Sequence, residues 1–419
     1  MRKALIPLVL TILALTPCVL GDWPQFLGPD RTGVAKTDAK LARSWPADGP
    51  QVLWTVALGE GFAGPAVKDG KVYLLDRQGD NDVLRCLNLA DGKELWKYSY
   101  AAPGRFGDPK YAGSRTTPTV GDKFVFTVGP FGHLHCVSLA THQPVWSHHI
   151  LKDFGGGVPG WNVAQSPVLY KNWVIVAPQS KQAGLAAYEQ ATGKLVWKSE
   201  PFGSMQYASP LVTTIDGVDQ VLMVANQGKG GTRIVGADAR DGKILWSYTG
   251  WNCNIPVPSV TAIGDGRFFI TGDYGAGCAM WKVARSGQSW EATELFRNRN
   301  SGSHIHNALL YEGHLYSNSS RDGKGLVCQD LEGKTVWNTG KSPSFDLGGN
   351  LIIVNDLIYI LDGNGGALHV VEASAAGYKQ LAKADLLEGQ KVWAPMAFSG
   401  GKLLIRDQKQ LRCVDVTAR

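Results

Sequence analysis

Aromatic, amide and charged side chains recur in eight short segments, each of which precedes a β-like stretch of the sequence. The segments read "GEGFAGP", "YAGSRTTP", "PGWNVAQSP", "SMQYASP", "GWNCNIPVP", "GSHIHNA", "SPSFDLGG" and "KVWAPM". Aromatic faces stack on flat ligands or sugars, an arginine pairs with a carboxylate, and amides fix the orientation of a ligand. The residues of these segments that could form one such site are Phe62, Arg115, Trp161, Asn162, Tyr207, Trp251, Asn252, Asn254, His304, His306, Asn307, Phe345, Asp346 and Trp393. The structural alternative is that each of these side chains only caps its own segment.

Two histidines in one segment have the spacing of a candidate metal site. His304 and His306 are two residues apart, so on an extended strand both side chains point to the same side. With Asp346 from a neighbouring segment they could bind a divalent metal, since such sites often use three protein ligands. His133 and His135 have the same spacing, and we interpret them as ordinary strand residues. The sequence contains no glycine-flanked serine of the kind that hydrolases use as a nucleophile.

A repeated phrase that ends in tryptophan indicates how the chain positions these segments. "DGKELW" is followed along the chain by "TGKLVW", "DGKILW" and "EGKTVW". The tryptophans of the series lie at intervals of 42, 50, 51, 49 and 91 residues, and a phenylalanine stands where the long interval lacks a tryptophan. Periods of this size indicate a solenoid or a propeller. The series consists of Trp54, Trp96, Trp146, Trp197, Trp246, Phe296 and Trp337.

Each repeat reads as four short strands. In the first repeat these are "GPAVKDG", "KVYLLD", "LRCLNL" and "KELWKY", with Asp69-Gly70 and Asp91-Gly92 at two of the turns. Asp-Gly suits the positive φ angles of a tight hairpin turn, and four antiparallel strands per repeat describe a propeller blade. Counting outer strands as far as a degenerate repeat near Leu381 gives eight. The sequence therefore predicts an all-β chain that folds as an eight-bladed β-propeller of four-stranded antiparallel blades with tryptophan-docking repeats.

The two ends of the predicted propeller complement each other. The chain ends on three strands in "WAPMAFSGGKLLIRDQKQLRCVDV" and supplies a single outer strand early, in "QVLWTVAL". We expect the N-terminal strand to pair with the C-terminal blade, because this closure removes open sheet edges. In such a propeller the loops that enter the inner strands, and the loops that join the second and third strands, open on one face around the central channel. The eight segments above are these entering loops, and we call the channel mouth that they surround the funnel.

The repeats resemble the tryptophan-docking repeats of the pyrroloquinoline-quinone (PQQ) propeller superfamily, from about Trp23 to Val416. That superfamily includes quinoprotein dehydrogenases and the outer-membrane assembly lipoprotein of the β-barrel machinery. The start "DWPQFLGPDRTGV" and the ending also resemble secreted PQQ-like repeat proteins. The resemblance implies either a scaffold or an enzyme that holds PQQ and calcium, the latter with a disulfide between adjacent cysteines. This sequence has no Cys-Cys pair, and Glu60 and Asp346 are the acidic residues of the funnel segments.

Three parts of the chain are predicted. Residues 1–21 read as a signal peptide, because Arg2 and Lys3 precede an apolar run and small residues precede Asp22. The run is shorter than the ~20 residues of a membrane-spanning helix, so we expect no transmembrane segment. "LTPC" is a weaker alternative signal for lipid attachment. Residues 22–50 form an N-terminal extension packing on the propeller, and residues 51–419 form the single propeller, in the periplasm or outside the cell.

The charge argues against a nucleic-acid partner, and the cysteine pattern argues against a disulfide framework. The chain has 42 Lys and Arg against 36 Asp and Glu, and no basic run long enough for a nucleic-acid track. Four cysteines share one blade position, which indicates buried thiols rather than a disulfide framework. Cys253 and Cys278 fall near loops of one blade, so a bond between them stays open.

We interpret the sequence as a secreted, monomeric binding or scaffold module. Its ligand is a small planar or glycan molecule in the funnel, or its partner is a protein at the funnel or the blade surface. The alternative function is an atypical PQQ-dependent dehydrogenase that oxidises alcohols or sugars. The residues themselves assign no cofactor. PQQ and calcium are cofactors that only the family resemblance implies.

Overall fold

The first blade shows how the local sequence makes a blade. In a computed structural model, which describes residues 21–229, 231–343, 345, 348–389 and 391–418, Asp69 and Gly70 have φ angles of 50° and 69°. This left-handed pair forms the two-residue turn between β3 (Ala66–Lys68) and β4 (Lys71–Gln78). The blade continues antiparallel through β5 (Asn81–Asn88) to β6 (Glu94–Ala101). The two middle strands are largely buried, whereas β6 alternates between half-buried and exposed side chains along most of its length because it lies at the rim.

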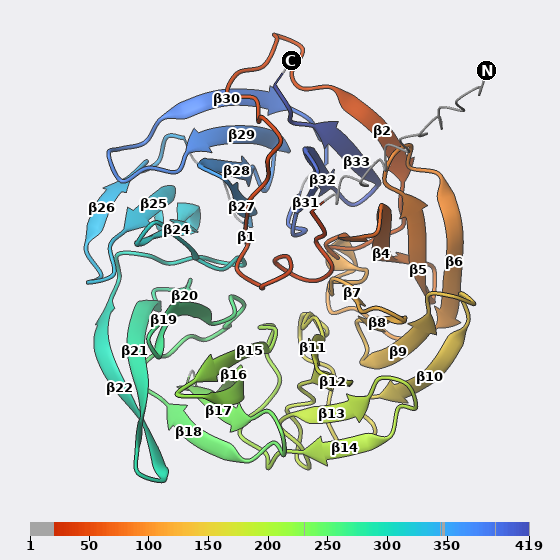
Figure 1. Cartoon of the computed structure of the whole chain (residues 1–419), viewed down its shortest axis with the longest axis vertical. Coiled ribbons are helices and arrows are strands. Elements are labelled where there is room, and N and C mark those ends of the chain that lie inside the picture. Colours follow the sequence, from red (N-terminus) through yellow and green to blue (C-terminus); the bar gives the residue numbers. More distant parts are fainter. Residues whose placement is uncertain (1–20, 230, 344, 346–347, 390, 419) are drawn as a thin grey trace, which may run out of the picture.

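Six further blades repeat this order around the ring (Figure 1). The second and third contain β7 (Thr119–Val120), β8 (Phe124–Val128), β9 (His133–Ser138), β10 (Pro144–His149), β11 (Val168–Tyr170), β12 (Trp173–Val176), β13 (Ala186–Glu189) and β14 (Leu195–Lys198). The fourth and fifth contain β15 (Leu211–Ile215), β16 (Val218–Gly228), β17 (Gly231–Asp238), β18 (Ile244–Tyr248), β19 (Thr261–Gly264), β20 (Arg267–Gly272), β21 (Gly277–Ser286) and β22 (Ser289–Asn298). The sixth and seventh contain β23 (Leu309–Tyr311), β24 (His314–Asn318), β25 (Leu326–Gln329), β26 (Thr335–Asn338), β27 (Leu351–Val354), β28 (Leu357–Leu361), β29 (Ala367–Glu372) and β30 (Gln380–Asp385).

The eighth blade is built from both parts of the chain that the sequence predicted to meet. Its strands are β31 (Ala397–Ser399), β32 (Lys402–Arg406), β33 (Gln410–Asp415) and, from the N-terminal side, β2 (Val52–Ala57), which pairs antiparallel with β33. The prediction of an all-β, eight-bladed propeller closed in this way is confirmed. Besides strands, the described residues contain two 3₁₀ turns, η1 (Pro109–Tyr111) and η2 (Ser320–Asp322).

In the four repeats that contain it, the repeated phrase joins the blade to the one before it. The glycine of "DGKELW", Gly92, lies on the indole of Trp54 in the preceding outer strand, and a β-carbon at position 92 would come within 2.7 Å of that ring. Gly193 and Trp146 make the same contact. Gly333 packs in this way on Phe296, the residue that stands in for the missing tryptophan of the series. The glycine and the aromatic ring therefore form one interblade joint.

The indole N–H groups do not all bind the neighbouring blade. Trp54 and Trp146 donate to carbonyls of the following blade, Leu89 at 3.0 Å and Gln190 at 2.8 Å. Trp246 instead donates to the side chain of Gln220 in its own sheet. The indole N–H of Trp197 has no hydrogen-bond partner within the described part of the chain. Packing is therefore common to the series, whereas the hydrogen bond is not.

Residues 22–50 cross the central channel before they reach β2, and we call residues 22–36 of this segment the arm (Figure 1). Trp23 exchanges two backbone hydrogen bonds of 2.8 Å with Val67 on an inner strand. Further along, β1 (Val34–Ala35) pairs in parallel with β27 of the seventh blade. No helix among the described residues is long and apolar enough to span a membrane. The predicted signal peptide, residues 1–21, lies outside the described residues except for Gly21.

Candidate funnel site

A cavity of about 360 Å³ opens where the entering loops surround the central channel. This volume falls within the range of small-ligand sites. Entering loops, loops between second and third strands, and the arm all contribute to its wall. The lining consists of Phe26, Phe62, Tyr111, Arg115, Trp161, Ala164, Ser166, Tyr207, Ser209, Ile255, Val257, Ser259, Tyr274, His304, Ile305, His306, Arg321, Trp393 and Pro395.

Three aromatic rings form a stack on one wall of the cavity. The Trp393 ring lies 5.5 Å from the Phe62 ring and 5.5 Å from the Tyr111 ring, each at an angle of 27°. Trp161 meets Tyr111 edge-on at 5.1 Å and 85°, and 42% of Trp161 is exposed. Such a corner of perpendicular rings presents flat apolar surface together with ring edges, which suits a flat ligand.

Arg115 lies beside this stack without a carboxylate partner. Its guanidinium donates to the carbonyls of Gly113, at 2.7 Å, and Tyr111, and it stands 5.1 Å from the centre of the Phe62 ring. No ion pair joins Arg115 to any described acidic residue. Burial lowers the pKa of Arg115 to about 10, so the group stays charged at neutral pH. A half-buried cation that is held only by neutral groups can still pair with an anion.

The opposite wall carries a histidine held between a tyrosine and an arginine. Nε2 of His304 lies 3.1 Å from the Tyr274 hydroxyl and 3.1 Å from Nη1 of Arg321. Burial, followed by the nearby arginine, lowers the pKa of His304 to about 4, so the ring is neutral at pH 7. Because a guanidinium only donates hydrogen bonds, Nε2 must accept and the proton resides on Nδ1.

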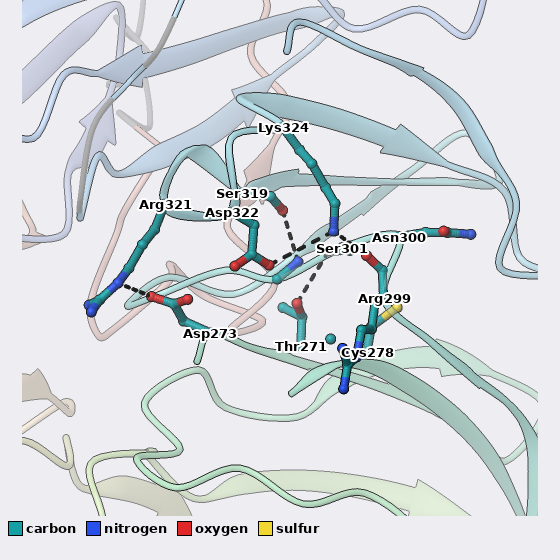
Figure 2. Close-up of polar contacts among 12 residues, drawn as sticks. Thr271, Asp273, Cys278, Arg299, Asn300, Ser301, Ser319, Arg321, Asp322 and Lys324 are labelled. Carbon is teal, nitrogen blue, oxygen red and sulfur yellow. Dashed lines mark hydrogen bonds and ion pairs between the residues drawn. The ribbon is translucent and has the colours of Figure 1, made fainter. Parts of the chain in front are cut away.

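A second layer of polar groups holds Arg321 in place. Figure 2 shows Arg321 pointing to Asp273, whose Oδ2 lies 3.0 Å from Nε of the arginine. Asp273 is 2% exposed, and its own burial raises its pKa. Next to this pair, Asp322 and Lys324 form an ion pair of 3.8 Å, and Ser319 accepts a hydrogen bond from the backbone of Gly302. Arg321 is therefore neutralised by the protein, whereas Arg115 is not.

A chain of interblade hydrogen bonds surrounds the channel below the rings. The hydroxyl of Ser166 accepts from the backbone N–H of Thr117, Ser209 accepts from Ser166, and Ser259 accepts from Ser209, at 2.8–2.9 Å. Asn307 continues the series by accepting from Ser259 at 2.9 Å. These hydrogen bonds link the blades at four successive junctions around the funnel.

The structure brings about half of the predicted funnel residues to the cavity. The predicted residues that line it are Phe62, Arg115, Trp161, Tyr207, His304, His306 and Trp393. Six others are absent from the lining: Asn162, Trp251, Asn252, Asn254, Asn307 and Phe345. Asp346 lies outside the described residues.

The excluded residues have structural contacts instead. Trp251 is 1% exposed and packs in the core between the fourth and fifth blades, with its N–H 3.3 Å from the Gly277 carbonyl. Phe345 is completely buried against His369. Asn307 is the last acceptor of the hydrogen-bond chain.

The three remaining predicted amides also lie away from the lining. Asn162 is 2% exposed, with a left-handed φ of 63°. Asn252 accepts from the Thr232 backbone, and Asn254 accepts through its carbonyl from Asn226. None of the four predicted asparagines lines the cavity, and their role in orienting a ligand stays a prediction.

The two histidines of the predicted metal site lie in a bend before β23, not on a strand. His306 is 4% exposed, and both of its ring nitrogens have protein partners, Gly348 O at 2.7 Å and Asn350 Nδ2 at 2.9 Å. In the described part of the chain no three His, Cys, Asp or Glu side chains are grouped as a metal would require. The predicted third ligand, Asp346, is outside that part.

Cys253 and Cys278, for which the sequence left a disulfide open, are both free and buried. Burial raises the pKa of each thiol to about 11, so neither is a reactive thiolate at neutral pH.

Of the lining residues that the sequence analysis did not predict, four are aromatic or charged. Tyr111 belongs to an entering loop that was read only for its arginine. Tyr274 and Arg321 lie between the second and third strands of their blades. These loops also face the funnel, but the sequence analysis took its candidate residues from the entering loops only. Phe26 belongs to the arm, for which the repeat pattern has no signal.

The lining can be tested against PQQ with calcium, which the resemblance implies. Calcium takes six to eight oxygen ligands, mostly carboxylates and carbonyls. The described lining contains no Asp or Glu, and the sequence contains no adjacent cysteines to cover a quinone. The residues of the cavity therefore do not fit calcium-bound PQQ as held in the family dehydrogenases.

Comparison with known proteins places this fold among characterised relatives. Residues 26–156 and 79–339 match the family model described as outer membrane protein assembly factor BamB. Quinohemoprotein alcohol dehydrogenase from Comamonas testosteroni is 14% identical, with a TM-score of 0.64 over 95% of this chain and 81% of that chain. BamB from Moraxella catarrhalis is 13% identical, with a TM-score of 0.61 over 87% of this chain and 99% of that chain.

A europium-containing methanol dehydrogenase is also similar, at 13% identity and a TM-score of 0.67 over 94% of this chain and 89% of that chain. At such identities the solved structures show a common fold alone. No curated protein matches the sequence significantly.

Proposed function

The chain belongs to the BamB-type family of PQQ-like β-propellers, and from this premise we propose that it is an exported binding module that holds a small, flat anion in its funnel. The observation that carries the proposal is Arg115, a half-buried guanidinium with no acidic partner among the described residues, beside three stacked rings. A flat carboxylate supplies both the missing charge and a face for stacking.

The donors of the lining favour an aromatic acid over a neutral glycan. Arg115 and the hydroxyl of Tyr207, which accepts from the Trp161 backbone and keeps its own proton, can donate, whereas the described lining has no carboxylate and no amide. Sugar hydroxyls must also donate, and a buried donor without an acceptor costs roughly 1–3 kcal/mol. An aromatic carboxylate only accepts, so the ligand itself brings no donor that needs an acceptor.

Export follows from the leader that the sequence predicts, and the matched family description names an outer-membrane assembly factor. We therefore place the protein in the periplasm or outside the cell. A protein partner on the blade surface and a PQQ-dependent dehydrogenase are the two competing functions. The lack of carboxylates in the described lining argues against calcium-bound PQQ.

The test is binding of 2-naphthoate and of its neutral analogue 2-naphthamide, followed by calorimetry and thermal shift. We expect naphthoate to bind more tightly, and Arg115→Ala to weaken naphthoate about tenfold or more while changing naphthamide little, because a charge-assisted hydrogen bond contributes ~1.5–3 kcal/mol. Arg105→Ala is the matched control, since Arg105 is an exposed arginine of the same connection between β6 and β7 and does not line the cavity.

Two outcomes contradict the proposal. If neither probe binds, or if Arg115→Ala leaves the preference for the anion unchanged, the funnel is not an anion site. If the purified protein mixed with PQQ and calcium oxidises alcohols or aldoses in a dye-linked assay, the enzymatic alternative replaces the proposal.

A further inference from the structure

The bottom of the funnel cavity is formed by a segment outside the repeats. Phe26, on the arm, lines the cavity of about 360 Å³. Phe26 also lines a void of about 10 Å³, together with Leu27 and Arg31. A larger cavity of about 790 Å³ lies along the same arm and includes Arg31 but not Phe26. The Phe26 ring therefore separates the funnel from the rest of the channel.

The arm is fixed on both sides of this ring. Before it, Trp23 pairs with Val67, and the carbonyl of Pro24 accepts from the Val120 backbone at 2.8 Å. After it, the carbonyl of Gly33 accepts from Ile353 at 2.9 Å. These hydrogen bonds attach the arm to the first, second and seventh blades.

Arg31 anchors the arm from inside the channel. Its Nη1 donates to the Pro210 carbonyl at 2.7 Å, and its Nη2 donates to the Pro167 carbonyl. Its Nε donates to Gln25 at 2.9 Å, across the turn that carries Phe26. Arg31 is 8% exposed, and burial lowers its pKa to about 9. A buried cation bound to carbonyls of the third and fourth blades holds the turn against the channel wall.

We propose, on the basis of the funnel function above, that Phe26 is the specificity-determining floor of the ligand site. The arm closes the channel, and the Phe26 ring sets the depth to which a flat ligand enters. The ring is only partly buried, as expected for a side chain that faces an open cavity. The blades thus form the walls of the site and carry its positive charge, whereas Phe26 on the arm limits the length of the ligand that fits.

The first experiment needs no ligand. In a Cys18→Ser background, Phe26→Cys and Leu27→Cys are treated with a small methanethiosulfonate reagent, because the six described cysteines are buried. We expect the thiol at position 26 to react at least about tenfold faster than the thiol at position 27. The reason is that Leu27 itself is only 4% exposed. Equal reaction rates at the two positions would contradict the proposal that Phe26 forms the floor of the cavity.

The second experiment measures depth with two acids of different length, 2-naphthoate and biphenyl-4-carboxylate. We expect Phe26→Ala to shift the affinity ratio about tenfold towards the longer acid and Phe26→Trp to shift it the other way. Phe124→Ala, on β8 outside the cavity, is the control for loss of a phenyl ring.

The outcomes separate the two proposals. If wild type binds both acids and neither Phe26 variant changes their ratio, Phe26 does not set specificity although the funnel still binds. If neither acid binds the wild-type protein, the proposed function is wrong. The reaction rates of the two cysteine variants then test by themselves whether Phe26 forms the floor of the cavity.

Discussion

The α-carbon of Gly92 lies against the indole of Trp54, so that a side chain at position 92 would begin 2.7 Å from the ring. Gly92 has a φ of 72°, in the left-handed region that favours glycine. The two residues are 38 positions apart and belong to neighbouring blades. Turn geometry and interblade packing therefore require glycine at the same position.

Gly92→Ala is expected to destabilise the protein by about 1–3 kcal/mol, because the added methyl group overpacks the Trp54 ring. Gly70→Ala is the matched control, since Gly70 has a similar φ of 69° with open space around it. Urea unfolding of the two variants separates packing from backbone strain. Equal losses of unfolding free energy would mean that the indole contact contributes nothing.

Trp146→Phe is expected to cost about 1 kcal/mol more than Trp197→Phe. Both substitutions remove the same part of the ring, but only the N–H of Trp146 has an acceptor among the described residues, the Gln190 carbonyl at 2.8 Å. Trp197→Ala should cost ~3–5 kcal/mol, as for large aromatic residues in a core. Unfolding in urea measures all three, and a loss below about 1 kcal/mol for Trp197→Ala would contradict its packing role.

Trp251→Ala is expected to destabilise the protein by ~3–5 kcal/mol, in contrast to the ligand-binding role that the sequence indicated. The reason is that Trp251 is 1% exposed in the core between blades. Trp161→Ala, which removes a ring that is 42% exposed, should stay within about 0.5 kcal/mol of wild type and instead weaken naphthoate binding. The reverse pattern in urea unfolding would place Trp251, not Trp161, at the ligand.

Acid should destabilise the fold between pH 6.5 and pH 4. Burial lowers the pKa values of His133, His135, His304 and His306 from 6.5 to about 4, so in this window the unfolded chain binds protons that the folded chain does not. Stability is then present above pH 6.5 and is lost as the pH falls. Burial raises the pKa of Asp82 to about 6, so this carboxyl group takes up a proton in the folded chain and opposes the loss of stability. It is one group against four histidines.

Melting temperatures measured from pH 7 to pH 4 check this dependence. His135→Phe keeps a ring against Tyr100, where the wild-type rings lie 3.7 Å apart, but has no proton to gain. We expect its loss of melting temperature on acidification to be smaller than that of wild type. A melting temperature that does not change over this range would contradict the assignment.

The sequence by itself determined the architecture. Strand number, blade count and closure depend on features that recur at a fixed period, such as Asp69-Gly70 at a turn or Trp96 in an outer strand. Each recurrence is local, and eight similar repeats average out errors in any one of them. The pairing of β2 with β33 followed because the incomplete first and last repeats complement each other.

Only the tertiary structure decided which loop residues form the site. Gly160-Trp161-Asn162 and Gly250-Trp251-Asn252 are the same tripeptide in equivalent loops, yet Trp161 is 42% exposed at the funnel and Trp251 is 1% exposed in the core. The direction of a side chain in a loop depends on its backbone angles and on the neighbouring blade, neither of which the repeat encodes. Phe26 reaches the cavity through contacts between the arm and distant blades, and such long-range contacts leave no local pattern in the sequence.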